Sequence, residues 1–400
     1  MHCACFPLGN GIFMSENSAT SASRFSILHH FSDRWGDGRV PYGQLVFENG
    51  FLYGTTTYGG PPYKTPPTNP DNKGNVFKMK LNGQGFQILH NFSGGANDGW
   101  KPWSGVVIKD DTIYGSTVYG GPQGEKGGVL YKLNVDGSGF HILHPFGGTD
   151  DGFGASTSPT LVEDCLYGLT RWGHISTGTI YCYDTIRDTF KQLHRFGADD
   201  GYEPIGTMTA GNDGFLYGLA WHGGLNDMGT LFRLKAEEPS FEILHHFTGG
   251  EQGKYPYDTL VFDGEHTLYG TTLGTYGDDP SDLGTIFKYD IADEIYSVLH
   301  KFAGKNNDSG KPNGSVVLSN DGKLLYGTTH GDKVWGGEEY GCLYQMNIDG
   351  SEFNLLHKFT GNLAGDTPMR TPLLIDGALY GMTAYGGSNN YGTIYRYQIL

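Results

Sequence analysis

Three polar side chains follow copies of one short sequence signature and have the chemistry of acid–base catalysts. Arg171, His222 and His330 each come just after a Leu-Tyr-Gly segment, where the copies of that segment differ from one another. Imidazole titrates near neutral pH and can transfer a proton, and a guanidinium can polarise a carbonyl group. We therefore predict Arg171, His222 and His330 as catalytic residues.

Aromatic residues beside these positions are candidates for binding a substrate. Together they would form an apolar pocket with a few polar groups, which is the usual form of a small-molecule site. The alternative is that these aromatic side chains pack between structural repeats. The predicted binding residues are Trp172, Trp221, Trp103, Tyr42, Tyr257, Trp335, Met369 and Arg370.

Most histidines have a different explanation, because seven of the fifteen occur in a repeated Leu-His-x-Phe signature. A residue that recurs in every repeat serves the fold, so we expect hydrogen-bonded structural positions on outer strands. These histidines are His29, His90, His144, His194, His245, His300 and His357.

Motifs for cofactors and metals do not occur in the chain. It has no Gly-x-Ser-x-Gly elbow, His-Glu-x-x-His zinc motif, phosphate-binding loop or dinucleotide fingerprint. The five cysteines match neither a disulfide framework nor a paired zinc motif. Residues 1–23 lack the basic start of a secretory signal. We expect no cofactor, no metal, a flexible leader over residues 1–23 and a cytoplasmic location.

Three interleaved signatures, each present seven times, define internal repeats. Besides Leu-His-x-Phe they are Leu/Ile-Tyr-Gly, and a glycine followed by a β-branched or apolar pair and an aromatic residue. The Leu/Ile-Tyr-Gly copies begin at Leu52, Ile113, Leu166, Leu216, Leu268, Leu325 and Leu379. The third signature begins at Gly74, Gly128, Gly178, Gly229, Gly284, Gly341 and Gly392.

Each repeat predicts four short strands, since apolar and polar residues alternate and β-branched and aromatic residues are frequent. Four strands per repeat and seven repeats predict an all-β, seven-bladed β-propeller that forms a single domain over residues 24–400. The last repeat lacks a fourth strand, and residues 25–31 carry that signature. We expect the N-terminal strand to complete the last blade.

Composition agrees with this fold and excludes two classes of partner. The chain has 65 glycines in 400 residues, which suits many tight turns, including Asp-Gly pairs that predict type I′ hairpins. Its formal net charge of −16 argues against binding nucleic acid or an anionic membrane surface. No apolar run is long enough to span a membrane as a helix.

Loop length predicts which face of the propeller carries the site. The connections between strands one and two, and between strands three and four, are tight turns. The other connections are long and irregular, as in residues 59–73 and 331–340. Because function concentrates on variable loops held by a rigid scaffold, we place the site on this second face, over the mouth of the channel.

The motifs also resemble a known family. Leu-Tyr-Gly-Thr-Thr, Tyr-Gly-Gly, Gly-Thr-Ile-Phe-Lys and Leu-His-x-Phe, over residues 25–400, are similar to the GloVer tandem repeat, which implies a propeller. By its size, the free-standing propeller is also similar to the intermolecular hetero-Diels–Alderases of fungal tropolonic sesquiterpenoid pathways. That similarity implies the joining of a quinone methide to a terpene without a cofactor.

The favoured hypothesis is therefore a cofactor-independent enzyme of secondary metabolism that holds an apolar small molecule in a reactive geometry. Alternatives are a carbohydrate- or protein-binding propeller without catalysis, and a lyase or hydrolase of a polymer. An enzyme pocket is expected to be deep and lined by the residues named above, whereas a carbohydrate platform is expected to be shallow. We expect a monomer or weak homodimer.

Overall fold

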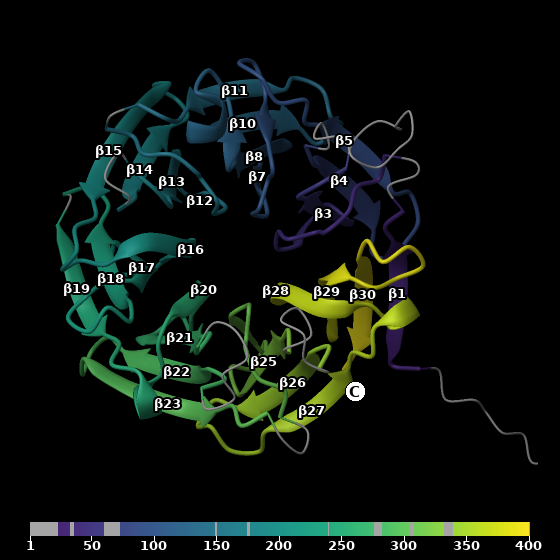
Figure 1. Ribbon diagram of the computed structural model, residues 1–400, viewed down its shortest axis with the longest axis vertical. Coiled ribbons are helices and arrows are strands. Elements are labelled where there is room, and N and C mark those ends of the chain that lie inside the picture. Colours follow the sequence, from purple (N-terminus) through teal and green to yellow (C-terminus); the bar gives the residue numbers. More distant parts are fainter. Residues whose placement is uncertain are drawn as a thin grey trace, which may run out of the picture.

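Seven four-stranded antiparallel sheets surround a central axis in the computed structural model (Figure 1). The predicted all-β, seven-bladed propeller is confirmed. The structure describes residues 23–32, 36–59, 73–148, 150–173, 177–238, 240–275, 282–304, 308–331 and 339–399. Helix in these ranges is limited to the single turns Gly124–Lys126, Gly250–Gln252 and Asn362–Ala364. None of the helical segments so described is long and apolar enough to cross a membrane.

The strands of each blade run from the axis outward in chain order. Blades one to three comprise β2 (Val46–Glu48), β3 (Phe51–Thr56), β4 (Asn75–Lys80) and β5 (Gln87–Asn91); β7 (Val107–Lys109), β8 (Thr112–Thr117), β10 (Val129–Asn134) and β11 (His141–Pro145); and β12 (Thr160–Val162), β13 (Cys165–Thr170), β14 (Thr179–Asp184) and β15 (Thr189–Arg195). A separate two-stranded ladder joins β6 (Gly99–Trp100) and β9 (Tyr119–Gly120).

Blades four to six have the same order. They comprise β16 (Tyr202–Ala210), β17 (Phe215–His222), β18 (Thr230–Lys235) and β19 (Phe241–His246); β20 (Pro256–Phe262), β21 (Thr267–Thr272), β22 (Thr285–Asp290) and β23 (Ile295–Lys301); and β24 (Val316–Leu318), β25 (Leu324–Thr329), β26 (Cys342–Asn347) and β27 (Asn354–Lys358).

Blade seven closes the ring with strands from both ends of the chain. It comprises β28 (Asp366–Ile375), β29 (Ala378–Tyr385), β30 (Thr393–Gln398) and β1 (Phe25–His30). Strand β1 pairs with β30 from Phe25 opposite Tyr397 to His30 opposite Thr393. The predicted closure by the N-terminal strand is confirmed.

The glycine of each Leu/Ile-Tyr-Gly segment makes room for the aromatic residue of the next strand. A Cβ atom on Gly54 would lie 2.6 Å from the ring of Phe77. A Cβ atom on Gly270 would likewise lie 2.5 Å from the ring of Phe287. A larger residue at these positions would displace a buried aromatic ring, so two of the sequence signatures are one packing unit.

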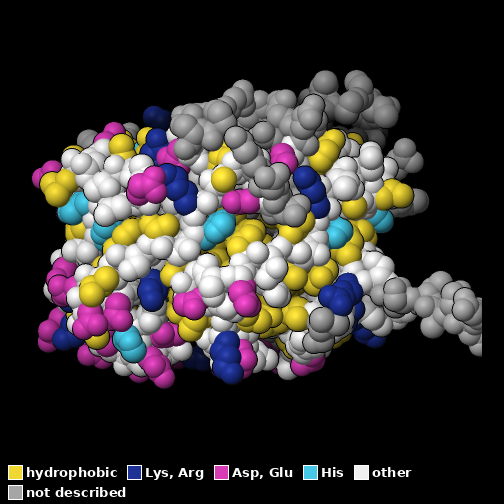
Figure 2. All heavy atoms as spheres, turned by 90° about the horizontal axis from the view of Figure 1, so that it is seen from below, with side chains coloured by type: hydrophobic (Ala, Val, Ile, Leu, Met, Phe, Trp, Pro, Cys, Tyr) yellow, Lys and Arg dark blue, Asp and Glu magenta, His cyan; other side chains and the backbone are white. Residues whose placement is uncertain are grey.

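The repeated histidines join each blade to the next. His29 stacks on Phe86 of the following blade with ring centroids 4.0 Å apart, and its Nε2 lies 3.2 Å from Asp37. All seven histidines stack in this way, and five of them also contact an aspartate. Figure 2 shows His side chains recurring along the outer wall between hydrophobic patches. The predicted outer-strand packing role holds for all seven, but the predicted hydrogen bond does not: within the described residues, Nε2 of His245 and of His357 has no partner.

Most Asp-Gly turns differ from the predicted type I′ geometry. Of the pairs predicted to form such turns, only Asp376–Gly377 has positive φ at both residues, +47° and +70°. The others are Asn82–Gly83, Asp136–Gly137, Asp213–Gly214, Asp321–Gly322 and Asp349–Gly350. At Asp136–Gly137 the glycine alone has positive φ, +91°, and Oδ1 of Asp136 accepts a hydrogen bond from the backbone N–H of Ser138 at 2.8 Å. This side-chain bond stabilises a turn in which the aspartate keeps negative φ.

Candidate functional site

The inner strands meet around the axis at one residue per blade, which we call the collar. Each of these residues lies two positions after the inner-strand proline or, in blade three, two after Ala155. Neighbouring members touch through their backbones: a Cβ atom on Gly43 would lie 2.6 Å from the carbonyl oxygen of Ser104. The collar consists of Gly43, Ser104, Thr157, Gly206, Asp258, Gly314 and Arg370.

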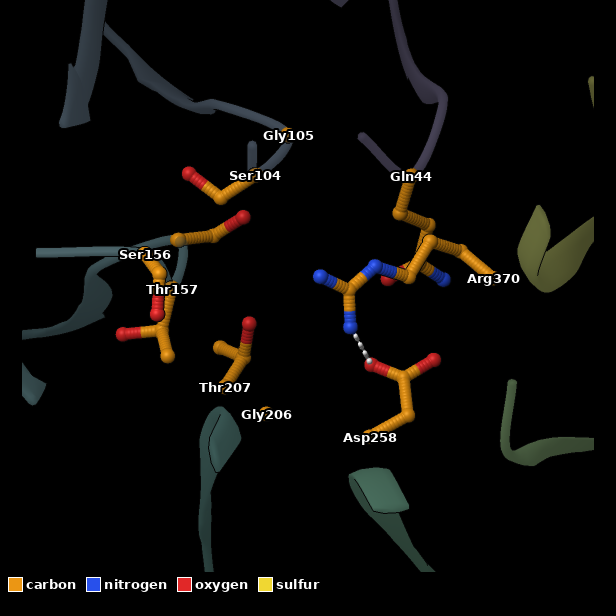
Figure 3. Close-up of a pocket in the computed structure, with 10 residues that line it drawn as sticks. Gln44, Ser104, Gly105, Ser156, Thr157, Gly206, Thr207, Asp258 and Arg370 are labelled. Atoms are coloured by element: carbon orange, nitrogen blue, oxygen red, sulfur yellow. Dashed lines mark hydrogen bonds and ion pairs between the residues drawn. The ribbon is translucent and has the colours of Figure 1, made fainter. Parts of the chain in front are cut away.

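Two members of the collar are charged, and they meet across the channel. Nη1 of Arg370 lies 3.2 Å from Oδ1 of Asp258 (Figure 3). The same guanidinium donates from Nε to the carbonyl oxygen of Tyr42 at 3.2 Å and from Nη2 to that of Trp103 at 3.4 Å. One side chain of blade seven therefore ties together blades one, two and five.

The carboxylate of Asp258 also accepts hydrogen bonds from groups other than Arg370. Its Oδ2 accepts hydrogen bonds from the backbone N–H of Ser315 at 3.3 Å and from the hydroxyl of Thr371 at 3.2 Å. Burial acts to lower the pKa of Arg370, but the charge of Asp258, the neighbouring Tyr257 and Tyr42 and the hydrogen bond to Asp258 together outweigh it, so that pKa lies above its usual value. The guanidinium of Arg370 therefore stays charged at neutral pH.

Backbone bulges aim these two side chains. Asp258 and Arg370 have φ of +68° and +58°, and the strand register shifts where each of them lies. Positive φ costs a residue other than glycine about 1–2 kcal/mol, and bulges are often found where a side chain must be re-aimed. Such strain at paired charges is typical of a functional position.

Above the collar, Arg171 lies between two tryptophans. Its guanidinium carbon is 5.2 Å from the ring centroid of Trp172 and 4.9 Å from that of Trp221. Nε and Nη2 of Arg171 donate to Oε2 of Glu203 at 2.9 Å and 2.7 Å. The ion pair fixes the cation against both rings, and all four side chains are only partly buried.

His222 extends this cluster along the mouth. Its ring stacks on Tyr202 at 5.3 Å and lies 4.7 Å from Trp221 and 5.0 Å from Tyr255. Burial lowers the pKa of His222, while the carboxylates of Glu203 and Asp227 oppose this shift. The imidazole is therefore mainly neutral at pH 7 and able to accept a proton.

Tyr257 connects this cluster to the collar. Its ring centroid lies 6.0 Å from that of Trp221 and 5.8 Å from the guanidinium carbon of Arg370. On the far side of the channel, Tyr42 and Trp103 face each other at 6.5 Å. Aromatic rings thus continue from the loops down to the charged pair.

A second aromatic cluster lies on blades one and two. The ammonium group of Lys101 is 5.4 Å, 5.1 Å and 5.2 Å from the ring centroids of Tyr58, Trp100 and Tyr119. Lys101, Glu203 and Tyr255 occupy equivalent places before the inner-strand proline, with φ of +56°, +52° and +58°. We call the two clusters and the rings between them the aromatic rim.

The family of the chain follows from a match that covers most of its length. The model of the Gloeobacter/Verrucomicrobia repeat matches residues 63–279 and 273–400. The chain belongs to the Gloeobacter/Verrucomicrobia repeat family. The resemblance to that repeat predicted from sequence is confirmed, whereas the similarity to hetero-Diels–Alderases stays a prediction.

Solved structures share the fold of this repeat protein. The extracellular domain of the BT4673 system from B. thetaiotaomicron has a TM-score of 0.57 and 11% identity, over 93% of this chain and 40% of that one. The repeat protein thus spans two fifths of that ectodomain. An oligogalacturonate lyase in complex with manganese has a TM-score of 0.58 and 12% identity, over 96% of this chain and 94% of the lyase. The GH74 enzyme of Niastella koreensis has a TM-score of 0.59 and 10% identity, over 93% of this chain and 53% of that enzyme. No curated protein gives a significant sequence match.

The repeat protein brings most of the predicted site residues to one face. Arg171, Trp172, Trp221, His222 and Tyr257 form a continuous cluster, and Tyr42 and Trp103 lie across the mouth from them. Arg370 lines the collar, while Met369 is 4% exposed and its sulfur accepts a hydrogen bond from Nδ2 of Asn313 at 3.5 Å.

Two predicted residues lie apart from that cluster. His330, on blade six, is 4% exposed, and its Nδ1 is 2.6 Å from the carbonyl oxygen of Gly331. Trp335 is outside the described residues. Catalysis by Arg171, His222 or His330 stays a prediction.

Sequence reasoning missed Asp258, Glu203 and Lys101. Asp258 had a signal, because the other collar residues are glycine, serine or threonine apart from Arg370. Glu203 and Lys101 have no such signal in the sequence, because only the structure shows that the residue before the inner-strand proline points toward the rings of the mouth. Within the described ranges, no three His, Cys, Asp or Glu side chains are grouped in a way that could hold a metal ion.

Proposed function

We propose that this protein binds a carbohydrate on its aromatic rim. The observation that carries the proposal is the cluster itself: the non-repeat residues Arg171, Trp172, Trp221 and His222 contact one another, and all four are only partly buried. Sugar rings present C–H groups that pack on the faces of aromatic rings, whose electron-rich faces attract them.

The polar groups beside the rim support the same class of ligand. The hole at the collar has a volume of about 10 Å³, and Gln44, Ser104, Ser156 and Thr207 line it. Ser104, Ser156 and Thr207 lie on the other side of the opening from the Arg370–Asp258 pair, and Gln44 lies beside Arg370 (Figure 3). This opening admits no more than a water-sized group, so a sugar would rest above it and reach the collar through hydroxyl groups or water.

The charges beside the rings favour one class of carbohydrate, the anionic sugars. Arg171 and Lys101 stand among the rings of a chain whose net charge is −16, and Arg39 lies 5.5 Å from the ring of Tyr58. Cations gathered on one face of an acidic protein attract anionic ligands and raise their association rate. Similar folds that serve an oligogalacturonate lyase and a GH74 xyloglucanase also support a carbohydrate ligand, and we favour an acidic oligosaccharide.

Calorimetry with oligogalacturonate and with xyloglucan oligosaccharides tests the proposal. We expect Trp221→Ala to weaken binding of the acidic sugar at least tenfold, because a stacking surface and the support of Arg171 are lost together. Ile186→Ala is the matched control, since Ile186 is 74% exposed and follows β14 in the strand three–four turn. Equal affinity of wild type and Trp221→Ala would contradict the proposal.

A second candidate is the cofactor-independent enzyme, including a hetero-Diels–Alderase. His222 favours it, because burial keeps the imidazole neutral beside Arg171 and Tyr202. His222 could remove a proton from the substrate while Arg171 polarises its carbonyl group. Mass spectrometry of mixtures of quinone-methide precursors and alkenes tests this activity, with His222→Gln as the variant. Product formation unchanged by that substitution would exclude His222 as the base.

A further inference from the structure

A larger cavity lies on the far side of the collar from the aromatic rim, and we call it the chamber. It has a volume of about 290 Å³ and shares Gln44, Gly105, Ser158 and Thr207 with the collar hole. The other lining residues lie further along the inner strands. The chamber therefore continues the channel from the charged pair toward the face opposite the aromatic rim.

The walls of the chamber are chemically divided. Val46, Val107, Leu161 and Met208 form an apolar body, and Pro159 and Val106 extend it. The polar groups of Gln44, Ser158 and Thr207 lie at the collar end, and the hydroxyl of Thr160, further along, donates a hydrogen bond to the carbonyl oxygen of Met208. This surface differs from the aromatic rim, which carries cations and large rings.

All the lining residues come from blades one to four, so the chamber lies on one side of the axis. The cavity is lined by the short inner strands β2, β7 and β12, of three residues each, and by the long β16, of nine; of the other inner strands, β20 and β28 are long, with seven and ten residues, and β24 is short, with three. The long strands carry bulges at the collar, and two of these bulges hold Asp258 and Arg370.

We propose that the chamber binds a small, mainly apolar molecule that carries one hydroxyl or carbonyl group. A cavity of this size equals about ten water volumes, which suits a ring compound of roughly ten non-hydrogen atoms. The apolar body of the ligand would displace poorly held water from valine and leucine walls, a favourable exchange in a preformed pocket. Its polar group would face Gln44 and Thr207, next to the guanidinium of Arg370. This site is separate from the proposed carbohydrate surface.

Saturation-transfer difference NMR with 4-ethylphenol tests the proposal. Val107→Phe and Val46→Phe each fill the chamber from a different blade, so one remains informative if the other fails to fold. We expect signal from 4-ethylphenol with the wild type and at least a fivefold loss with either filled variant. Thermal melts of the variants show which of them are folded.

Trp221→Ala separates the chamber from the aromatic rim. We expect this variant to keep its 4-ethylphenol signal while oligogalacturonate binding falls. The chamber proposal is overturned if the wild type gives no signal, if folded filled variants keep it, or if Trp221→Ala abolishes it. If oligogalacturonate binds wild type and Trp221→Ala equally, or does not bind at all, while the 4-ethylphenol results are as expected, only the carbohydrate proposal is contradicted.

Discussion

Arg370 and Asp258 form an ion pair across the channel, although 112 residues separate them in the chain. They come from blades seven and five, and both are almost fully buried, with 9% and 6% exposure. The pair therefore connects parts of the ring that share no strand pairing. Because its geometry closes the channel, stability and ligand access depend on the same two side chains.

Removing one partner of this pair should destabilise the protein strongly. We expect Arg370→Met to lower the free energy of unfolding by about 3–5 kcal/mol, because the carboxylate of Asp258 would stay buried without its counter-charge. Chemical denaturation at pH 7 measures this. The double variant Arg370→Met/Asp258→Asn should recover part of the loss, since the residues are in contact.

Arg187→Met is the matched control for that experiment. Arg187 also forms an ion pair, with Asp184 at 2.6 Å, but its side chain is 80% exposed. Exposed pairs contribute about 0–1 kcal/mol, so this substitution should change stability little. Equal effects of the two arginine substitutions would show that the buried pair has no special role.

The fold was predictable because its packing rules recur in every blade. Gly54 and Phe77 illustrate this: the two residues form one packing unit, and each belongs to a sequence signature that repeats seven times. The rim residues Arg171 and His222 were predictable for the opposite reason, since they depart from the repeat.

The rest of the site has a weaker signal in the sequence, or none. Asp258 has the weaker kind, because the residue two positions after the inner-strand proline is uncharged in every blade except those of Asp258 and Arg370. The chamber is a different case. Val46 and Val107 resemble ordinary strand residues, and only the arrangement of the inner strands in space shows that they line a cavity.

The His–Asp contacts predict a loss of stability at acid pH. Asp98 accepts hydrogen bonds from Nε2 of His90 at 3.2 Å and from the backbone N–H of Ser93 at 2.8 Å. Burial acts to raise the pKa of Asp98, but these bonds outweigh it and lower that pKa. The stabilisation is full above the unfolded value near 3.8 and is lost as pH falls through the lower folded pKa.

Asp98→Asn should therefore cost about 2 kcal/mol at pH 7 and progressively less below pH 4. Urea denaturation of both proteins across this pH range measures the difference. Asp321→Asn is a suitable control, because Asp321 caps an exposed turn. A difference that grows toward acid pH would refute this account.

His357 predicts a second pH effect in a higher window. The position that holds aspartate in five blades is Ala364 here, and Nε2 of His357 finds no hydrogen-bond partner within the described residues. Burial lowers the pKa of His357 to about 4. As pH falls from 6.5 to 4 the unfolded chain gains a proton that the folded protein resists, so stability should fall.

Ala364→Asp should correct this deficiency. The new carboxylate would face His357 as Asp37 faces His29, raise the pKa of the imidazole, and flatten the loss of stability between pH 6.5 and 4. Histidine NMR titration and thermal melts measure both effects. Ala364→Asn adds similar bulk without charge, so an equal response of the two variants would disprove the electrostatic explanation.

Closure of the ring predicts what the N-terminal strand contributes. Without β1, strand β30 would expose an unpaired edge from Thr393 to Gln398, and His357 would lose the ring of Phe25, which stacks on it at 3.7 Å. Exposed strand edges pair with other chains. We therefore expect deletion of residues 1–31 to give aggregates or strand-exchanged oligomers in size-exclusion chromatography with light scattering. Deletion of residues 1–20 keeps β1 and should leave the elution and the melting temperature unchanged. A monomeric 32–400 protein with the wild-type melting temperature would contradict the structural role of β1.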